Sequence, residues 1–319
     1  MFTARSVLME NWPELQYERW KDTYATLHLW TQVVGKIRLA QSPWLNHSWH
    51  VPLYVTARGL TTSSIPYRER VFDIAFDFVD HALVLRVSDG VERRLPLQPR
   101  TVADFYAAVM SMLDEAGIPV RIDRIPNEIA EAIPFDQDTI HSAYDAEYVQ
   151  RFWRALLQVD RVFSQFRTAF LGKCSPVHFF WGSFDLAVTR FSGRSAPPHP
   201  GGIPHLADSV VREAYSHEVS SAGFWPGGRG VEYPVFFSYA YPEPPGFRET
   251  AVRPAAAAFN TALGEFLLAY DAVRTAPDPD RALLEFLQST YEAAANAAHW
   301  ERSALECDQG QAGVPRAVP

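Results

Sequence analysis

The stretch that says most about the fold is residues 175–194, which read SPVHFFWGSFDLAVTRFSGR. A Ser-Pro pair ends the helical pattern before it, and the aromatic and β-branched run that follows is typical of a strand. Residues 42–60 read SPWLNHSWHVPLYVTARGL and repeat this order of features. The matched pairs are Trp49 with Trp181, Arg58 with Arg190 and, within one residue of register, Pro66 with Pro197. The match predicts an internal duplication.

The pattern around these two stretches also recurs. Apolar residues at spacings of three and four predict helices over residues 13–39, 101–117, 145–171, 250–274 and 280–305. Runs of strands lie between the long helices, without strict alternation of helix and strand. The sequence therefore predicts an α+β fold of two diverged copies of a helix-strand unit, with mixed or antiparallel sheets and packed helices.

The chain divides accordingly into two repeats. The first α+β repeat spans 1–125, and a connector with two prolines spans 126–145. The second repeat spans 146–306 and carries a His-rich insertion at 192–230, where the first copy has only a short turn. Residues 307–319 have no periodicity and are predicted to be a disordered tail.

Composition limits the partners. The 319 residues carry a formal charge of -8 without a basic stripe, which argues against nucleic acid. The sequence contains no signal peptide and no long apolar run, so we expect no membrane partner. The two cysteines lie far apart, which favours a reducing compartment and hence the cytoplasm. Homo-oligomerisation stays open.

A concentration of histidines is the sharpest chemical signal. Four of the ten histidines fall within about forty residues of the second copy, together with Asp185 and Glu218. Such groups suit zinc, or ferrous iron held by two histidines and a carboxylate, although the spacing matches no established signature. The candidate metal ligands are His178, His199, His205, His217 and Glu218, and the candidate catalytic residues are His178, Asp185 and Arg190.

His178 and Asp185 fall on opposite faces of one regular strand. They can converge only if the strand bulges, and Gly182-Ser183 is a suitable place for a bulge. We expect His178 and at least one histidine of the insertion to face a common cavity near Asp185. The alternative for His178 is a half-buried residue that hydrogen-bonds to the backbone.

Aromatic and arginine side chains are the candidates for substrate binding. They are Phe180, Trp181, Arg194, Phe224 and Trp225. The rings could form a wall for a planar or apolar ligand, and a guanidinium could bind a carboxylate or phosphate. Core packing for Trp181 and a structural tether for Arg190 are the alternatives.

A family resemblance covers nearly the whole chain. The string HFFWGSFDLAVTRFSGR, with PNEIAEAIPF before it and GFWPGG after it, resembles an uncharacterised bacterial family, a domain of unknown function. The resemblance implies no substrate, cofactor or reaction.

The function must therefore be inferred from the individual residues. Our first hypothesis is a small-molecule enzyme with its site on the second repeat and a divalent metal, iron or zinc, as its cofactor. The alternative is a non-catalytic small-molecule binding protein with an aromatic pocket, and a third possibility is a protein-interaction scaffold. The nucleotide, nucleophile-elbow and CxxC motifs are all absent.

Overall fold

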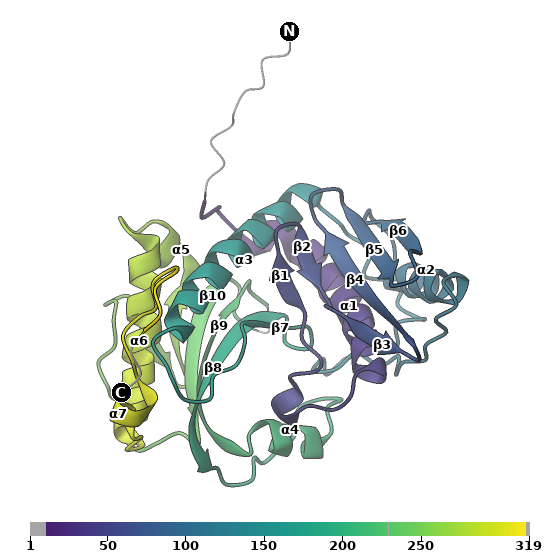
Figure 1. The fold of residues 1–319 in the computed structure, drawn as a ribbon. Helices are drawn as coiled ribbons and strands as arrows, with labels where there is room; N and C mark the ends of the chain where they lie inside the picture. The colour runs from purple at the N-terminus through teal and green to yellow at the C-terminus, as the bar shows by residue number, and fades with distance from the viewer. Residues whose placement is uncertain (1–10, 229, 317–319) are drawn as a thin grey trace.

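The computed structural model describes residues 11–228 and 230–316, which form two six-stranded sheets with helices packed around them. Every pair of neighbouring strands is antiparallel. The predicted α+β class is therefore confirmed. Figure 1 shows the two sheets side by side, with the helix α3 (Ala146–Arg167) running across both. No helix in the described part of the chain is long and apolar enough to cross a membrane.

The first half builds one sheet and two helices that pack on each other. Its elements are α1 (Tyr17–Gln41), the 3-10 helix η1 (Asn46–Ser48), β1 (Tyr54–Thr56), β2 (Gly59–Thr61), β3 (Ile65–Tyr67), β4 (Arg70–Asp77), β5 (Ala82–Val87), β6 (Glu92–Pro96) and α2 (Val102–Glu115). The strand order is β1-β2-β4-β5-β6, with β3 also paired to β4. The Thr101 side chain accepts a hydrogen bond from the N–H of Asp104 and caps α2.

The second half builds the other sheet. Its elements after α3 are β7 (His178–Phe180), β8 (Asp185–Ser195), α4 (Asp208–Ala214), β9 (His217–Trp225), β10 (Val235–Tyr241), β11 (Ala258–Asn260), β12 (Glu265–Ala269), α5 (Tyr270–Arg274), α6 (Pro279–Ala297) and α7 (Arg302–Leu305). The strand order is β11-β12-β10-β9-β8-β7. In Figure 1, α5 and α6 cover the outer side of this sheet.

The two halves are joined at their edges and through α1. Leu53 and Phe179 exchange two backbone hydrogen bonds of 2.9 Å, which link the edge at β1 to the edge at β7. Helix α1 is buried around most of its circumference, because it packs on α2 and also contacts the turn between β7 and β8. One hydrophobic cluster runs through both halves, from Phe72 through Phe152 to Phe286. The predicted repeats 1–125 and 146–306 therefore share a core.

The structure does not show the predicted duplication. A long helix, a six-stranded sheet and further helices recur in that order, but the matched residues do not occupy equivalent places. Arg58 lies in the turn between β1 and β2, whereas Arg190 lies inside β8. Trp49 follows η1, whereas Trp181 lies in the turn between β7 and β8. Residues 42–60 and 175–194 are therefore similar in composition, but they do not occupy equivalent places in the fold.

Three segments differ from what their sequence pattern alone indicates. Residues 250–274 form β11, β12 and α5 instead of one helix, because tight turns interrupt the apolar spacing of three and four. The insertion at 192–230 contains β9, a central strand of its sheet, so it is partly scaffold. Residues 307–316 of the expected disordered tail contact the end of α3, where the Gly310 N–H donates to the Thr168 hydroxyl. Residues 317–319 lie outside the described part of the chain.

Candidate functional site

A cavity of about 360 Å³ lies on one face of the second sheet. Side chains alternate along a strand, so the odd-numbered residues of β8, β9 and β10 point toward this cavity, which we call the pocket. The strand residues that line it are Asp185, Ala187, Thr189 and Phe191 from β8, Val219, Ser221 and Trp225 from β9, and Phe237 and Tyr239 from β10. The even-numbered residues pack on the helices behind the sheet.

A loop from the predicted insertion closes the pocket. We call residues 196–216 the cover segment, and a 3.0 Å hydrogen bond from the Ala196 N–H to the Ser216 carbonyl joins its ends. Its residues Ile203, Leu206, Val210, Val211, Ala214 and Tyr215 line the pocket. The cover is fastened to the connector, because the Glu128 N–H donates to the Pro204 carbonyl at 2.8 Å. Residues 203–215 of the insertion therefore lie over the pocket.

Three carboxylates line the pocket: Glu128 from the connector, Asp185 from the start of β8 and Glu265 from the start of β12. Asp185 is only 5% exposed and accepts a hydrogen bond from the Ser183 hydroxyl. The Oε2 atom of Glu265 is buried and has no hydrogen-bond partner among the described residues. Burial, together with the negative charge of Asp185, raises the pKa of Glu265 to about 7.

A pair of tyrosines stands beside the carboxylates. The hydroxyls of Tyr215 and Tyr239 share a hydrogen bond of 2.7 Å and join the cover segment to β10. Burial raises the pKa of Tyr215 to about 12, and the nearby charges of Glu128, Glu265 and Asp185 act in the same direction. The tyrosines therefore stay protonated at neutral pH and can donate hydrogen bonds.

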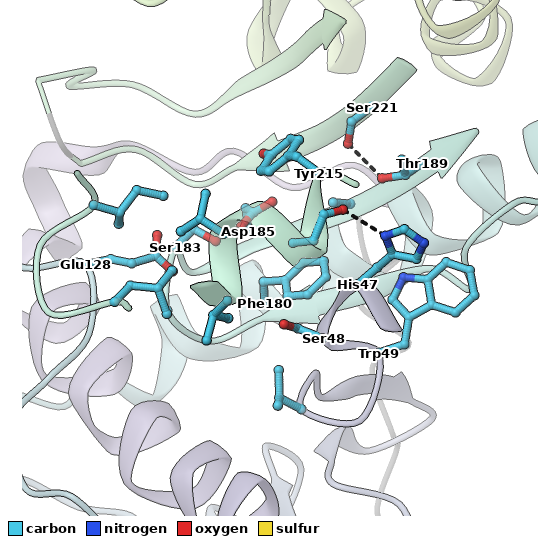
Figure 2. Close-up of a pocket in the computed structure, with 18 of the residues that line it drawn as sticks. His47, Ser48, Trp49, Glu128, Phe180, Ser183, Asp185, Thr189, Tyr215 and Ser221 are labelled. Carbon is cyan, nitrogen blue, oxygen red and sulfur yellow. Dashed lines mark hydrogen bonds between the residues drawn. The ribbon is translucent and has the colours of Figure 1, made fainter. Parts of the chain in front are cut away.

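The other end of the pocket is formed by η1. His47 has a φ of 58°, and its backbone N–H donates to the Glu213 carboxylate at 3.0 Å. The Lys173 ammonium donates to Nε2 at 2.6 Å, so Nδ1 carries the hydrogen and donates to the Ala214 carbonyl at 2.8 Å. Burial lowers the pKa of His47, which keeps this ring neutral. Figure 2 shows Glu128, Ser183 and Asp185 on one side of the pocket and His47 and Trp49 on the other.

Aromatic rings form much of the wall, as the sequence predicts for Phe180, Trp181 and Trp225. The indole N–H of Trp181 donates to the Val51 carbonyl at 2.8 Å, and that of Trp225 donates to the Ser183 carbonyl at 3.1 Å. Both rings are thus held by the backbone. Phe224 is the exception, because it points to the opposite face, is fully buried and packs on Phe236 and Tyr270.

His178 is placed differently from the prediction. Gly182-Ser183 is not a bulge but part of a turn between two strands, so His178 lies opposite Ala187 while Phe180 lies opposite Asp185. The His178 side chain is fully buried beside the rings of Trp49, Tyr54 and Phe180 and does not line the pocket. Both of its ring nitrogens lack a hydrogen-bond partner among the described residues. The position of His178 therefore fits neither the predicted catalytic role nor the alternative of a half-buried side chain that hydrogen-bonds to the backbone.

The predicted metal ligands are not brought together. His199 stacks on Tyr215, whereas His217 begins β9 beside His47, and neither they nor His205 line the pocket. Glu218 is bound to Arg194 at 2.6 Å. Nowhere in residues 11–228 and 230–316 do three or more His, Cys, Asp or Glu side chains lie in a group that could hold a metal ion. The expectation of a shared histidine cavity near Asp185 is therefore wrong.

The predicted arginines also lie outside the pocket. Arg190 faces the helices, where its guanidinium lies 3.5 Å from the ring centre of Phe166 and donates to the Phe166 carbonyl. Burial lowers the pKa of Arg190 to about 10. Arg194 forms its ion pair with Glu218 and donates to the Ala298 carbonyl. Both arginines therefore act as structural tethers, the alternative that the sequence offers for Arg190.

Sequence reasoning missed most of the polar groups of the pocket, because Asp185 was the only carboxylate or hydroxyl group of the lining that it predicted. Glu265 and Tyr239 lie within segments expected to be a helix and a plain strand, and Glu128 lies in the connector. His47 belongs to the copy expected to be scaffold. The two prolines and several acids of the connector indicate a segment that lies over the surface or in a cleft, and this is the signal that could have pointed to Glu128.

No curated protein and no solved structure matches the chain. One family model, described as a family of unknown function, matches residues 12–307, which include both sheets and the whole pocket. The chain therefore belongs to the family of unknown function DUF5996.

Proposed function

We propose that the chain is an enzyme that acts on a small molecule in the pocket by general acid–base catalysis, with Asp185 and Glu265 as its acid–base pair. The observation that carries the proposal is the placement of Glu265, whose buried carboxyl has a pKa of about 7 beside Asp185. A group that titrates near the working pH can both give and take a proton efficiently. Perturbed carboxyls in a cavity are typical of catalytic sites.

The two carboxyls are suited to different roles. Asp185 accepts a hydrogen bond from the Ser183 hydroxyl and is the candidate base. Glu265 in its protonated form is the candidate acid. The Tyr215–Tyr239 pair supplies hydroxyl groups that can orient a polar substrate atom nearby. The cover segment shields the reacting groups from bulk water.

The size of the pocket supports a small molecule as the substrate. A volume of about 360 Å³ lies within the ordinary range for ligand sites of roughly 300–1,000 Å³. Apolar side chains of the cover face the aromatic wall across this space. The substrate is thus expected to combine an apolar body with one polar end.

A non-catalytic binding protein is the second candidate. It is favoured by the wall itself, in which Phe180, Trp181 and Trp225 offer far more apolar contact than proton-transfer chemistry requires. On this alternative Asp185 and Glu265 would only bind the ligand. The two candidates differ in whether the bound molecule is released unchanged.

The test begins with the titration of Glu265. Carbon-13 NMR of the glutamate carboxyls should show one group titrating near pH 7 that is lost in Glu265→Gln and shifts to lower pH in Asp185→Asn, where the neighbouring charge is removed. Compounds from a metabolite mixture that the protein consumes should then be processed more slowly by Glu265→Gln, by roughly 10²–10⁴-fold.

Glu69→Gln is the matched control, because it removes one exposed carboxylate from the first sheet and should leave turnover unchanged. Full turnover by folded Glu265→Gln would refute the catalytic proposal. Recovery of a bound compound in unaltered form, with no product, would favour the binding protein.

A further inference from the structure

We propose that the pocket takes a carbonyl compound, whose oxygen accepts hydrogen bonds from the Tyr215 hydroxyl and the Glu265 carboxyl while its apolar body contacts the aromatic wall. This inference rests on the proposed function and deepens it by naming the class of substrate. It follows from a row of polar side chains across the sheet, from the order of the hydrogen bonds along that row, and from the two donors at its end.

The polar row crosses the floor of the pocket at right angles to the strands. Thr189 of β8 pairs with Ser221 of β9, and Ser221 pairs with Tyr239 of β10. The antiparallel register of β10 and β12, continued by one residue, places Glu265 beside Tyr239. Directly opposed side chains on one face of a sheet lie about 5 Å apart, so the four groups form a continuous row. All four line the pocket.

The neighbouring rows of the floor are apolar. Phe191 and Val219 lie on one side of the polar row, and Ala187 and Phe237 lie on the other. A ligand on this part of the floor therefore meets polar side chains only in the row between them. The row fixes where the polar atom of such a ligand lies.

The hydroxyls of the row are hydrogen-bonded in series. The hydroxyl oxygens of Thr189 and Ser221 lie 2.8 Å apart, and Ser221 donates to Tyr239. Tyr239 shares its bond of 2.7 Å with Tyr215 of the cover segment. Burial is the main cause that raises the pKa of both tyrosines, and this bond raises the pKa of Tyr239 further but lowers that of Tyr215, as it does when Tyr239 is the donor. The chain of bonds therefore runs from Thr189 to Tyr215.

Two donors remain unused where this chain ends. Tyr215 accepts the bond from Tyr239, and its own hydrogen has no acceptor in the described part of the chain. The Oε2 atom of Glu265 is buried and has no partner among those residues either, although buried polar atoms are nearly always paired. Because its pKa is about 7, Glu265 carries a proton below neutral pH. One ligand oxygen that accepts two hydrogen bonds would satisfy both groups.

A carbonyl oxygen suits these donors and the proposed chemistry. Its two lone pairs can accept from two donors at once. When Asp185 takes a proton from the carbon beside the carbonyl, the C–H electrons form a C=C bond. The π electrons of the C=O bond then pass to the oxygen, which takes the proton of Glu265. The product is a neutral enol, with Asp185 protonated and Glu265 ionised. A carboxyl group that an apolar site keeps neutral, so that it can donate to such an oxygen, is a known catalytic arrangement.

Binding of a ketone should weaken as the pH rises. The protonated form of Glu265 predominates at pH 6 and is mostly lost at pH 8, since its pKa is about 7. If only this form donates to the ligand, the affinity falls by about tenfold between pH 6 and pH 8. In Glu265→Gln the amide N–H donates at either pH, so the affinity should persist and its pH dependence should vanish. The pH dependence should be unchanged in Glu69→Gln.

The experiment compares a ketone with close copies of its shape. Fluorine-19 NMR titrations at pH 6 would measure 4-fluoroacetophenone, 4-fluoro-α-methylstyrene, in which a CH2 group replaces the oxygen, and 1-(4-fluorophenyl)ethanol. We expect the ketone to bind at least tenfold more tightly than the alkene and the alcohol. Tyr215→Phe should weaken ketone binding by about fivefold, the effect of one hydrogen bond, and should leave alkene binding unchanged if the pocket stays intact. Tyr233→Phe is the matched control, because Tyr233 is exposed and does not line the pocket.

The same ketone reports the proton transfer. In deuterium oxide the wild-type protein should exchange the methyl hydrogens of 4-fluoroacetophenone for deuterium, as measured by mass spectrometry. Asp185→Asn should not catalyse this exchange. Selective binding of the ketone without any exchange would uphold the carbonyl inference and favour the non-catalytic binding protein.

The possible failures can be told apart. Equal binding of the ketone and the alkene, tighter binding of the alcohol, or no binding of the ketone up to about 5 mM would overturn the carbonyl inference. None of these results would change the NMR titration of Glu265, on which the proposed acid–base role depends. Conversely, an ordinary Glu265 titration, with selective ketone binding that is weakened in Tyr215→Phe, would refute the proposed acid and uphold the carbonyl inference.

Discussion

At the scale of single residues, His178 is the most unusual side chain. It is fully buried among aromatic rings without a hydrogen-bond partner among the described residues, and burial lowers its pKa to about 3. The unfolded chain takes up a proton near pH 6.5, whereas the folded chain does not, so the wild-type protein should lose stability as the pH falls through 6.5. His178→Leu should remove this loss. Relative to wild type, the variant should gain about 2 kcal/mol in free energy of unfolding between pH 7.5 and pH 5.

Urea denaturation at the two pH values measures the difference directly. Other buried histidines, such as His47 and His50, also have lowered pKa values and contribute to the acid loss of both proteins. Their contribution cancels in the comparison. An identical wild-type-to-variant difference at both pH values would mean that His178 accepts its proton in the folded state.

Individual residues also show how far the sequence alone reaches. Phe180, Trp181, Trp225 and Asp185 were predicted for the site and do line the pocket, because they belong to one run of strongly patterned strand and turn. Glu265 could not be found in this way. Its role depends on the pairing of β12 with β10, a contact between segments that local periodicity does not encode.

At the scale of elements, α1 holds the two halves together at Gly35. A methyl group there would overlap the indole of Trp181, which is fixed by its hydrogen bond to Val51. Gly→Ala inside a helix ordinarily stabilises it, by about 1 kcal/mol. Here we expect the opposite sign, with Gly35→Ala lowering the free energy of unfolding by about 1–3 kcal/mol through overpacking.

A double-mutant cycle tests the cause. In a Trp181→Phe background the smaller ring leaves room, so the cost of Gly35→Ala should fall by at least half. Chemical denaturation of the four proteins gives the coupling energy. If the cost is the same in both backgrounds, the methyl group meets something other than Trp181.

Elements were predicted well where one face is apolar and poorly where turns are frequent. Helices α2 and α3 have strong amphipathic patterns and side-chain caps, and both were predicted. The region 250–274 contains Phe259 and Phe266 at a spacing that fits a helix. These rings instead face each other across β11 and β12, because Asn260 and Gly264 close a turn between the strands. Strand pairing overrides local periodicity there.

At the scale of the whole molecule, the shared core predicts cooperative unfolding. Packed residues run without interruption through both sheets and α3, so neither half can unfold without exposing the other. We expect one calorimetric transition, with equal van't Hoff and calorimetric enthalpies, and coincident curves from tryptophan fluorescence and circular dichroism. Two separated transitions would show that the predicted repeats are independent folding units.

The alternation of side chains across the second sheet affects how the sequence of such a chain can evolve. One face of β8, β9 and β10 lines the pocket, and the other face packs against the helices. A substitution at Ala187, Thr189 or Ser221 alters what the pocket accepts and leaves the helical face intact. Substitutions in the pocket lining can therefore accumulate one position at a time without disturbing the packing that stabilises the fold.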